Sequence, residues 1–298
     1  MPMRRASEDH DRRLRRNRVH AAKPVRQAKE QRRPSPGGDT QRALRLLTIN
    51  VHKGFSWLNK HFVLHELRDA LRATSADIVF LQEVTGQNVK RARRHDNWPV
   101  APHYAFLAES VWDQYAYGRN VVYNHGHHGN AVLSRYPIRS ASRVDISTNR
   151  IERRGMLHCV IGPTTGAATV HCICVHLALF EASRRKQFGM LRDYIRSSVP
   201  QEAALVVAGD FNDWKAGSGA RFGDLLGLTE VSVAIRGRPA RTYPSWLPLL
   251  SLDRIYCRGF EVLSSHILHG GTWSALSDHA GLAADVAAAP CLEHAGVA

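Results

Sequence analysis

The apolar run Ala204-Leu205-Val206-Val207-Ala208-Gly209 is followed directly by Asp210-Phe211-Asn212-Asp213. A short apolar run that is too brief for a helix indicates a buried strand, and this one ends on a carboxylate with an amide two residues later. A Gly-Asp pair is also common in turns, because glycine permits a positive φ and aspartate caps the residues that follow. A functional interpretation therefore depends on whether other strands of the chain end in the same way.

The first 42 residues are strongly basic and contain few large apolar side chains. They hold 13 Lys or Arg against 5 Asp or Glu, a net charge of +8, and include the stretch Pro34-Ser35-Pro36-Gly37-Gly38. Such a segment cannot bury enough apolar surface to offset the entropy lost on ordering it. We therefore expect a disordered basic tail over residues 1–42, a folded domain over 43–290 and a short C-terminal tail over 291–298.

The rest of the chain is mildly basic as well. It carries 28 Lys or Arg against 21 Asp or Glu, which is +7 of the chain's +15. A positive balance favours an anionic partner, namely nucleic acid, an acidic membrane surface or a phosphorylated small molecule. The alternative is a solvated basic surface that binds nothing specific.

Cysteine usage and hydropathy indicate the compartment. The five cysteines lie mostly in apolar, strand-like runs such as His171-Cys172-Ile173-Cys174-Val175, which is typical of reduced core thiols. No apolar stretch approaches the roughly 20 residues that span a bilayer, and the basic tail lacks the apolar core of a signal peptide. We expect a cytoplasmic monomer whose basic tail contacts nucleic acid or associates peripherally with an anionic membrane surface.

Strands outnumber helices in the hydrophobic pattern. Leu64, Leu67 and Leu71 share one helical face, and Phe188, Leu191 and Ile195 repeat the spacing. Strands are predicted at 44–50, 77–81, 131–134, 155–161, 168–175, 204–208, 252–257, 261–268 and 282–287. Several of them follow one another without a helix, which disfavours a purely parallel sheet. The pattern predicts mixed sheets packed on each other, with a few helices outside.

Polar side chains recur at, or just after, the ends of these strands. They are Asn50, Glu83, His176, Asp210, Asn212, Asp253, Asp278 and His279. Glu83 follows one of the most apolar segments, where an unpaired carboxylate would be costly to bury, so it either binds a cation or emerges at the surface. Carboxylate and amide oxygens suit Mg²⁺ or Mn²⁺ better than zinc. The recurrence therefore indicates metal-assisted phosphoryl chemistry.

Seven stretches resemble the endonuclease/exonuclease/phosphatase superfamily of metal-dependent phosphodiesterases, in family order and across residues 43–286. They are Leu47-Thr48-Ile49-Asn50, Leu81-Gln82-Glu83-Val84, Gly129-Asn130-Ala131-Val132-Leu133-Ser134, Val175-His176-Leu177, Gly209-Asp210-Phe211-Asn212, Leu252-Asp253-Arg254-Ile255 and Ser277-Asp278-His279. The resemblance implies a DNase I-like fold, a four-layer α/β/β/α sandwich of two mixed β-sheets. It also implies a Mg²⁺- or Mn²⁺-dependent phosphoric-ester hydrolase.

The same resemblance implies two groups of metal and water ligands. Glu83 would be the principal metal ligand, with Asn50 beside it and Asp278 near the metal. Asp210 would orient or deprotonate the attacking water, and Asn212 would hold the phosphate or that water.

The remaining implied roles concern histidines. His279 would bind the scissile phosphate and be oriented by Asp253. His176 stands where the DNase I and sphingomyelinase branches carry His and apurinic endonucleases carry Tyr, and His52 stands where those repair enzymes carry Asp. Both departures argue against an abasic-site repair enzyme.

Other basic and His-rich stretches have less specific interpretations. The insert from Tyr115 to Gly129 is a second transition-metal site or a substrate-facing loop at the rim of the active site, and the lack of a carboxylate favours the loop. Asn130, Arg154 and Arg119 are candidate substrate-binding residues, although Arg154 also fits a solvated strand start. Arg184-Arg185-Lys186 is predicted to form a solvated helix face.

Together these observations predict a metal-dependent phosphodiesterase or endonuclease that acts on nucleic acid. A phospholipid or sphingolipid headgroup phosphodiesterase is one alternative, and a non-catalytic polyanion-binding protein is another. A decayed enzyme is expected to lose Asp210, His279 or Glu83, and all three are present.

Overall fold

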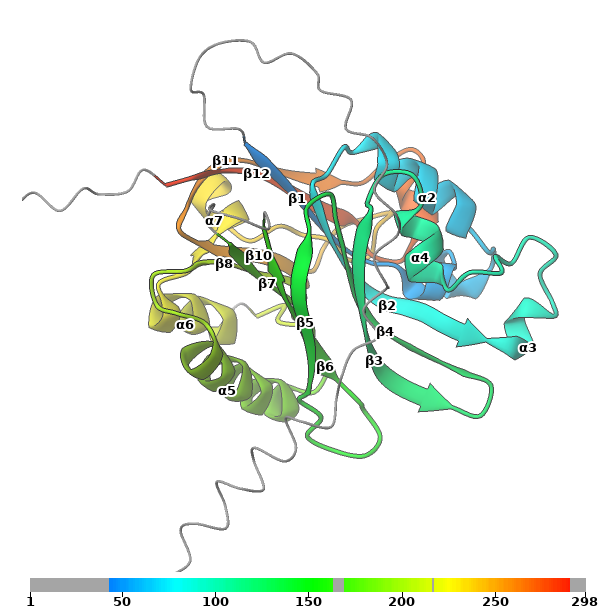
Figure 1. The fold of residues 1–298 in the computed structure, drawn as a ribbon, viewed down its shortest axis with the longest axis horizontal. Helices are drawn as coiled ribbons and strands as arrows, with labels where there is room; N and C mark the ends of the chain where they lie inside the picture. Colours follow the sequence, from blue (N-terminus) through cyan, green and yellow to red (C-terminus); the bar gives the residue numbers. More distant parts are fainter. Residues whose placement is uncertain (1–42, 163–168, 216, 290–298) are drawn as a thin grey trace, which may run out of the picture.

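A computed structural model describes residues 43–162, 169–215 and 217–289. Two six-stranded mixed sheets pack face to face (Figure 1). The first sheet has the order β11-β12-β1-β2-β4-β3, comprising β11 (Phe260–Leu268), β12 (Gly281–Ala288), β1 (Leu44–Asn50), β2 (Ile78–Asn88), β4 (Gly126–Ser134) and β3 (Gln114–Tyr123). The second has the order β5-β6-β7-β8-β10-β9, comprising β5 (Ile138–Asp145), β6 (Gly155–Ile161), β7 (Val170–His176), β8 (Ala204–Asp210), β10 (Asp253–Arg258) and β9 (Thr229–Glu230). In each sheet one strand pair is parallel, β1 with β2 and β7 with β8.

Helices cover the outer faces of both sheets. Helices α2 (Leu64–Ala73), α4 (His103–Ala108) and α8 (Trp273–Leu276) pack on the first sheet, whereas α5 (Glu181–Ser198) and α6 (Gly217–Leu226) pack on the second. Helix α7 (Val231–Arg236) packs beside β10 and β11, and α3 (Val89–Ala92) follows β2 directly. The 3₁₀ turns η1 (His52–Gly54) and η2 (Trp57–Asn59) follow β1. The predicted four-layer α/β/β/α sandwich is therefore confirmed.

Strand alternation explains why β8 reads as a continuous apolar run. Val206 and Ala208 point into the core between the sheets, while Leu205 and Val207 point toward α5. A strand that is buried on both faces needs apolar side chains at every position. Gly209 ends the run because a Cβ there would lie 2.0 Å from the backbone oxygen of Val175 in β7.

Several local predictions need correction. The strand expected over 77–81 continues to Asn88, and the insert expected as a loop is the long β3–β4 hairpin. β-Bulges allow both to continue, since the pairing shifts between Leu81 and Val84 and between Arg119 and Val121. Strands β3, β5 and β9 were not expected, because their apolar alternation is weak.

The predicted solvated face at residues 184–186 is wrong for Arg184. Its side chain is buried, its guanidinium lies 3.8 Å from the Asp213 carboxylate and donates to the Leu179 carbonyl oxygen, and it packs over the Trp214 ring. A full positive charge is tolerated there because each of these neighbours is negative or π-rich. The pairing with a residue 29 positions away could not be seen in a local charge run.

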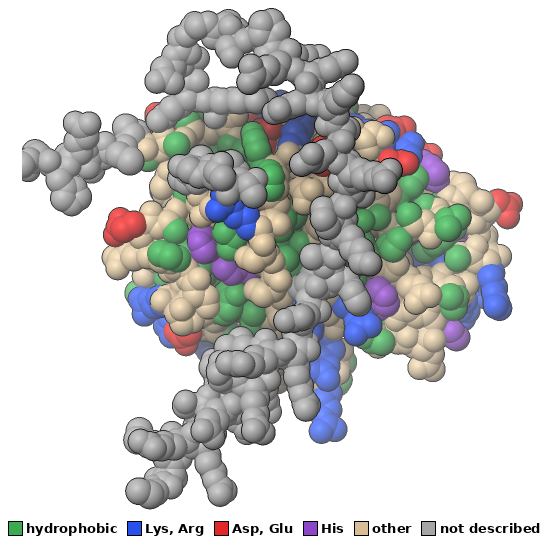
Figure 2. Space-filling view, in the orientation of Figure 1, with side chains coloured by type: hydrophobic (Ala, Val, Ile, Leu, Met, Phe, Trp, Pro, Cys, Tyr) green, Lys and Arg blue, Asp and Glu red, His purple; other side chains and the backbone are tan. Residues whose placement is uncertain are grey.

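Other predictions fall partly outside the described residues. The four described cysteines are free and buried, as expected for core thiols, whereas Cys291 and both predicted tails lie outside. No helix in the described part of the chain is long and apolar enough to cross a bilayer. Figure 2 shows basic side chains interspersed with hydrophobic and histidine side chains on one face, in keeping with the overall positive charge.

Candidate active site

One edge of the sandwich collects the polar residues that the sequence singled out. Asn50, His176 and Asp210 stand at the C-terminal ends of β1, β7 and β8. Asp253 was expected at a strand end but is the first residue of β10, which runs antiparallel to β8 and pairs Asp253 with Asp210. His279 lies two residues before β12 begins. Antiparallel pairing thus brings strand beginnings and strand ends to the same edge.

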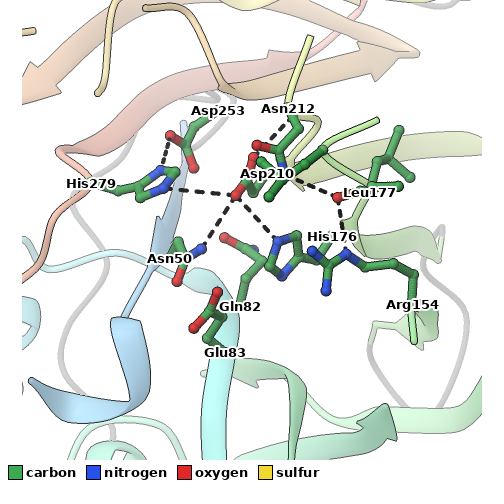
Figure 3. Close-up of polar contacts among 12 residues, drawn as sticks. Asn50, Gln82, Glu83, Arg154, His176, Leu177, Asp210, Asn212, Asp253 and His279 are labelled. Atoms are coloured by element: carbon green, nitrogen blue, oxygen red, sulfur yellow. Dashed lines mark hydrogen bonds and ion pairs between the residues drawn. The ribbon is translucent and has the colours of Figure 1, made fainter. Parts of the chain in front are cut away.

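The buried carboxylate of Asp210 is the centre of this cluster (Figure 3). Its Oδ2 accepts a hydrogen bond from Asn50 Nδ2 at 3.3 Å and lies 3.4 Å from His176 Nε2 and 3.8 Å from His279 Nε2. Its Oδ1 accepts from the backbone N–H of Asn212 at 3.0 Å. Residues from four separate strands or strand connections therefore converge on one carboxylate.

Asp253 and His279 form a buried pair beside it. His279 Nδ1 lies 2.8 Å from Asp253 Oδ2, which also accepts a hydrogen bond from Thr242 Oγ1 at 2.6 Å. Burial by itself would lower the pKa of His279, but the carboxylates of Asp253 and Asp210 outweigh it and raise the pKa to about 10. At neutral pH His279 is therefore an imidazolium that donates from Nδ1 to Asp253 and presents its Nε2–H to the centre of the site.

The other two titratable groups of the cluster shift in the directions that favour proton transfer. Burial raises the pKa of Asp210 to about 7, against the opposing effect of the positive charge on His279. Burial, assisted by the charge of Arg154, holds the pKa of His176 well below its usual range, so that imidazole is neutral. A carboxylate with a pKa near the working pH is suited to act as a general base.

Glu83 occupies a β-bulge rather than a strand end. Gln82 and Glu83 together face the single residue Asn130 of β4, and Glu83 has a φ of 55°. This conformation turns the Glu83 carboxylate toward the same edge as Asn50 and Asp210 (Figure 3). Bulges commonly redirect a side chain next to an active site.

A lysine that was not singled out as a site residue contacts that carboxylate. Lys53 Nζ forms a hydrogen-bonded ion pair with Glu83 Oε2. Burial would raise the pKa of Glu83, but the charges of Lys53 and His176 outweigh it, and the pKa lies well below its usual range. Lys53 lies in η1 with a φ of 60°, directly behind β1. The subgroup stretch Asn-Val-His-Lys-Gly contains it, yet nothing in the local pattern indicates a partner 30 residues away.

The two remaining predicted metal or phosphate ligands are held by short local contacts. Asn212 has a φ of 51° and donates from Nδ2 to the carbonyl oxygen of Leu177 at 3.0 Å. Asp278 Oδ1 lies 3.9 Å from His52 Nδ1 and accepts weakly from Ser277 Oγ at 3.3 Å. Ser277 Oγ also donates to the carbonyl oxygen of Asn50, which fastens the segment before β12 to the end of β1.

The three candidate substrate-binding residues are placed differently from one another. Arg154 lies at the margin of the cluster, where it donates to the Leu177 carbonyl oxygen at 3.1 Å and pairs with Glu152 at 2.9 Å. Asn130 is buried and donates to the carbonyl oxygens of Gly155 and Cys174, which joins the two sheets. Arg119 is exposed on β3, and no contact with the catalytic cluster is present among the described residues. The geometry favours only Arg154 as a residue near the substrate.

The His-rich hairpin contributes one histidine near the site. His128 is close enough to Lys53 and Glu83 for their charges to affect its pKa, which burial lowers to about 4. Its neighbour His127 points to the other face of β4, where Nδ1 lies 2.9 Å from the Tyr117 hydroxyl. No group of three or more His, Cys, Asp or Glu side chains that could hold a metal occurs in the described part of the chain. The hairpin therefore shows no second transition-metal centre within those residues.

Comparisons with known proteins agree with this architecture. The family model for the endonuclease/exonuclease/phosphatase family matches residues 47–279. The Escherichia coli K12 protein described as uncharacterized protein YbhP is 47% identical over 252 residues, covering 84% of this chain and 99% of its own.

Solved structures share the fold at low sequence identity. An endonuclease/exonuclease/phosphatase from Beutenbergia cavernae aligns with a TM-score of 0.62 at 20% identity, covering 83% of this chain and 72% of its own. D. rerio TDP2, complexed with single-strand DNA product, aligns with a TM-score of 0.61 at 18% identity over 82% of this chain and 98% of its own. The human Nocturnin catalytic domain, with a bound sulfate anion, aligns with a TM-score of 0.63 at 17% identity over 83% of this chain and 94% of its own. The chain therefore belongs to the endonuclease/exonuclease/phosphatase family, whose members are generally phosphoester hydrolases.

Proposed function

We propose that this protein is a Mg²⁺- or Mn²⁺-dependent phosphodiesterase. The observation that carries the proposal is the buried Asp210 carboxylate, with a pKa near 7, facing an imidazolium that Asp253 keeps charged. A base for water and a positive donor for a phosphate oxygen thus stand 3.8 Å apart. This spacing suits in-line attack at phosphorus, where catalysis depends mainly on positioning and electrostatics.

The donor set beside this pair fits a hard divalent cation. Glu83 offers a carboxylate and Asn50 an amide oxygen, and the ammonium of Lys53 already places one positive charge against Glu83. Few protein ligands are needed, because Mg²⁺ keeps several waters and completes its shell with substrate oxygens. When bound by Glu83 and Asn50, such a cation would neutralise charge on a nonbridging phosphate oxygen.

The protein's own groups supply the remaining steps. Asp210 Oδ2 accepts the proton of a water whose oxygen forms the new bond to phosphorus while the bond to the leaving oxygen breaks. His279 donates its Nε2–H to a phosphate oxygen and remains charged through its bond to Asp253. General-base action of this kind contributes about 10²–10⁴-fold to the rate.

Hydrolysis of bis(p-nitrophenyl) phosphate tests the proposal. We expect turnover with Mg²⁺ or Mn²⁺, none in EDTA, and a loss of about 10²-fold or more in Asp210→Asn. Asp285→Asn is the matched control, because Asp285 pairs with Arg45 on the surface, away from the site. Full turnover in EDTA would refute the metal requirement, and an active Asp210→Asn variant would refute the role of the base.

Nucleic acid remains the substrate that the charge of the chain favours. The single-strand DNA product in D. rerio TDP2 is compatible with this choice, although it describes that protein. A lipid-headgroup phosphodiester is the second candidate, because large apolar side chains surround the site.

A further inference from the structure

Exposed apolar side chains are concentrated around the active-site edge. Six of them lie on the two segments that follow β1 and precede β10: Trp57, Leu58, Trp246, Leu247, Leu249 and Leu250, here called the apolar rim. Leu58 is 62% exposed and Leu249 is 55% exposed. Apolar side chains scattered singly need no explanation, but a contiguous exposed group marks an interaction surface.

Contacts with the catalytic cluster hold both segments in place. The first segment carries Lys53, which pairs with Glu83. In the second, Thr242 donates to Asp253, the Tyr243 ring lies 5.1 Å from the His279 ring, and the Ser245 N–H donates to the Asp278 carbonyl oxygen at 2.8 Å. The apolar rim is therefore part of the mouth of the site rather than a remote patch.

The two segments also contact each other. The rings of Trp57 and Trp246 stack with centroids 5.4 Å apart and planes 28° apart. Leu58 and Asn59 have φ values of 60° and 54°, a conformation that costs energy for a non-glycine residue. The chain thus exposes leucine at a strained position beside the stacked tryptophans.

The charge of these segments is uniformly positive. Residues 51–63 and 238–252 contain Lys53, Lys60, Arg238 and Arg241 and no Asp or Glu. Lys60 and Arg241 are exposed next to the apolar rim. Tryptophan and leucine flanked by lysine and arginine are the composition of surfaces that enter the headgroup region of anionic membranes.

We propose that the apolar rim docks on a lipid bilayer containing anionic lipids and places the active site over the phosphodiester of a lipid headgroup. The choice of substrate class rests on the phosphodiesterase function proposed above, whereas the docking itself does not. Stacked nucleobases are a poorer fit, because Trp57 and Trp246 already cover one face of each other and leucines offer no π-face.

Vesicle binding by the full-length protein tests the docking. Vesicles of phosphatidylcholine alone, and of phosphatidylcholine with phosphatidylglycerol, are sedimented with wild type and with the double variant Leu58→Asp/Leu249→Asp. Aspartate tolerates the left-handed backbone at position 58. We expect the variant to bind the anionic vesicles about tenfold or more weakly, because two apolar side chains can no longer be buried. Leu263→Asp is the matched control, since Leu263 is 47% exposed on β11, and it should bind as wild type does.

Tryptophan quenching gives a second readout that does not depend on a charged substitution. Phosphatidylcholine brominated on its acyl chains should quench wild-type fluorescence, and Trp57→Phe/Trp246→Phe should lose that quenching while still binding. Every variant keeps residues 1–42, so a contribution of the basic tail is equal in all of them and should weaken with salt. Unchanged vesicle binding by the double leucine variant, or no quenching of the wild type, would overturn the proposal.

The arms of the experiment separate docking from catalysis. Vesicle binding without hydrolysis of bis(p-nitrophenyl) phosphate would refute the phosphodiesterase function and leave the docking surface standing. Hydrolysis without vesicle binding would do the reverse. If the leucine variant instead loses affinity for a single-stranded oligonucleotide, or a self-associated form dissociates, while vesicle binding is unchanged, then the surface serves that other partner and the proposal is wrong.

Discussion

Replacing Asp253 by asparagine is expected to discharge His279 near neutral pH. The pKa of His279 is about 10, against an ordinary value of 6.5, which corresponds to about 5 kcal/mol in favour of the imidazolium at 1.36 kcal/mol per pKa unit. This net effect comes from Asp253 and Asp210 acting against burial. Without the charge of Asp253, we expect the pKa of His279 to fall to its ordinary value or below.

The kinetic consequence follows from the sign of that change. Wild-type His279 stays protonated up to about pH 10, whereas in Asp253→Asn it loses its proton as the pH rises through the ordinary range of histidine. Loss of a charged donor to a transition-state oxygen costs about 10²–10³-fold in rate. We therefore expect a large defect at pH 8 that narrows toward pH 6, measured as kcat/KM for an aryl phosphodiester.

Two comparisons make this prediction specific. Thr242→Val removes the other hydrogen bond to the same Asp253 oxygen but leaves the carboxylate charged, so it should keep the wild-type pH profile. The double variant Asp253→Asn/His279→Ala should be little worse than His279→Ala, because residues acting as a unit give non-additive losses. A wild-type pH profile in Asp253→Asn, or an unchanged His279 pKa in an NMR titration, would refute this reasoning.

Three further substitutions test other parts of the structure. Glu83→Gln removes the charge beside Lys53 and should raise the Mg²⁺ concentration for half-maximal turnover by roughly tenfold or more; an unchanged cation titration would contradict the metal assignment. Arg184→Met breaks a buried ion pair with Asp213 and should lower the free energy of unfolding in urea by about 3–5 kcal/mol; a loss below about 1 kcal/mol would show that the pair contributes little. Burial raises the pKa of Glu230 to about 7, above its ordinary value of 4.5, so its contribution to stability is present below about pH 4.5 and is lost as the pH rises through 7. The difference in unfolding free energy between Glu230→Gln and wild type should therefore grow in favour of the variant from pH 5 to pH 8, and a difference independent of pH would exclude the buried carboxylate as the cause.

The fold was predictable from local patterns because its central strands are buried on both faces. The runs that became β1, β7 and β8 read as continuous apolar stretches for that reason. Edge and hairpin strands such as β3 and β5 alternate only weakly, since solvent accepts polar side chains on one face, and the sequence did not reveal them. Their assignment requires the partner strand.

The catalytic cluster divides along the same line. Sequence alone determined that Asn50, His176 and Asp210 follow buried strands, because strand periodicity and the polar residue after it are both local. Only the tertiary structure decided that Lys53 pairs with Glu83 inside a bulge and that Arg184 is buried on Asp213. These pairings join residues about 30 positions apart, and a charge in a sequence carries no information about which distant opposite charge the folded backbone will bring within 4 Å of it.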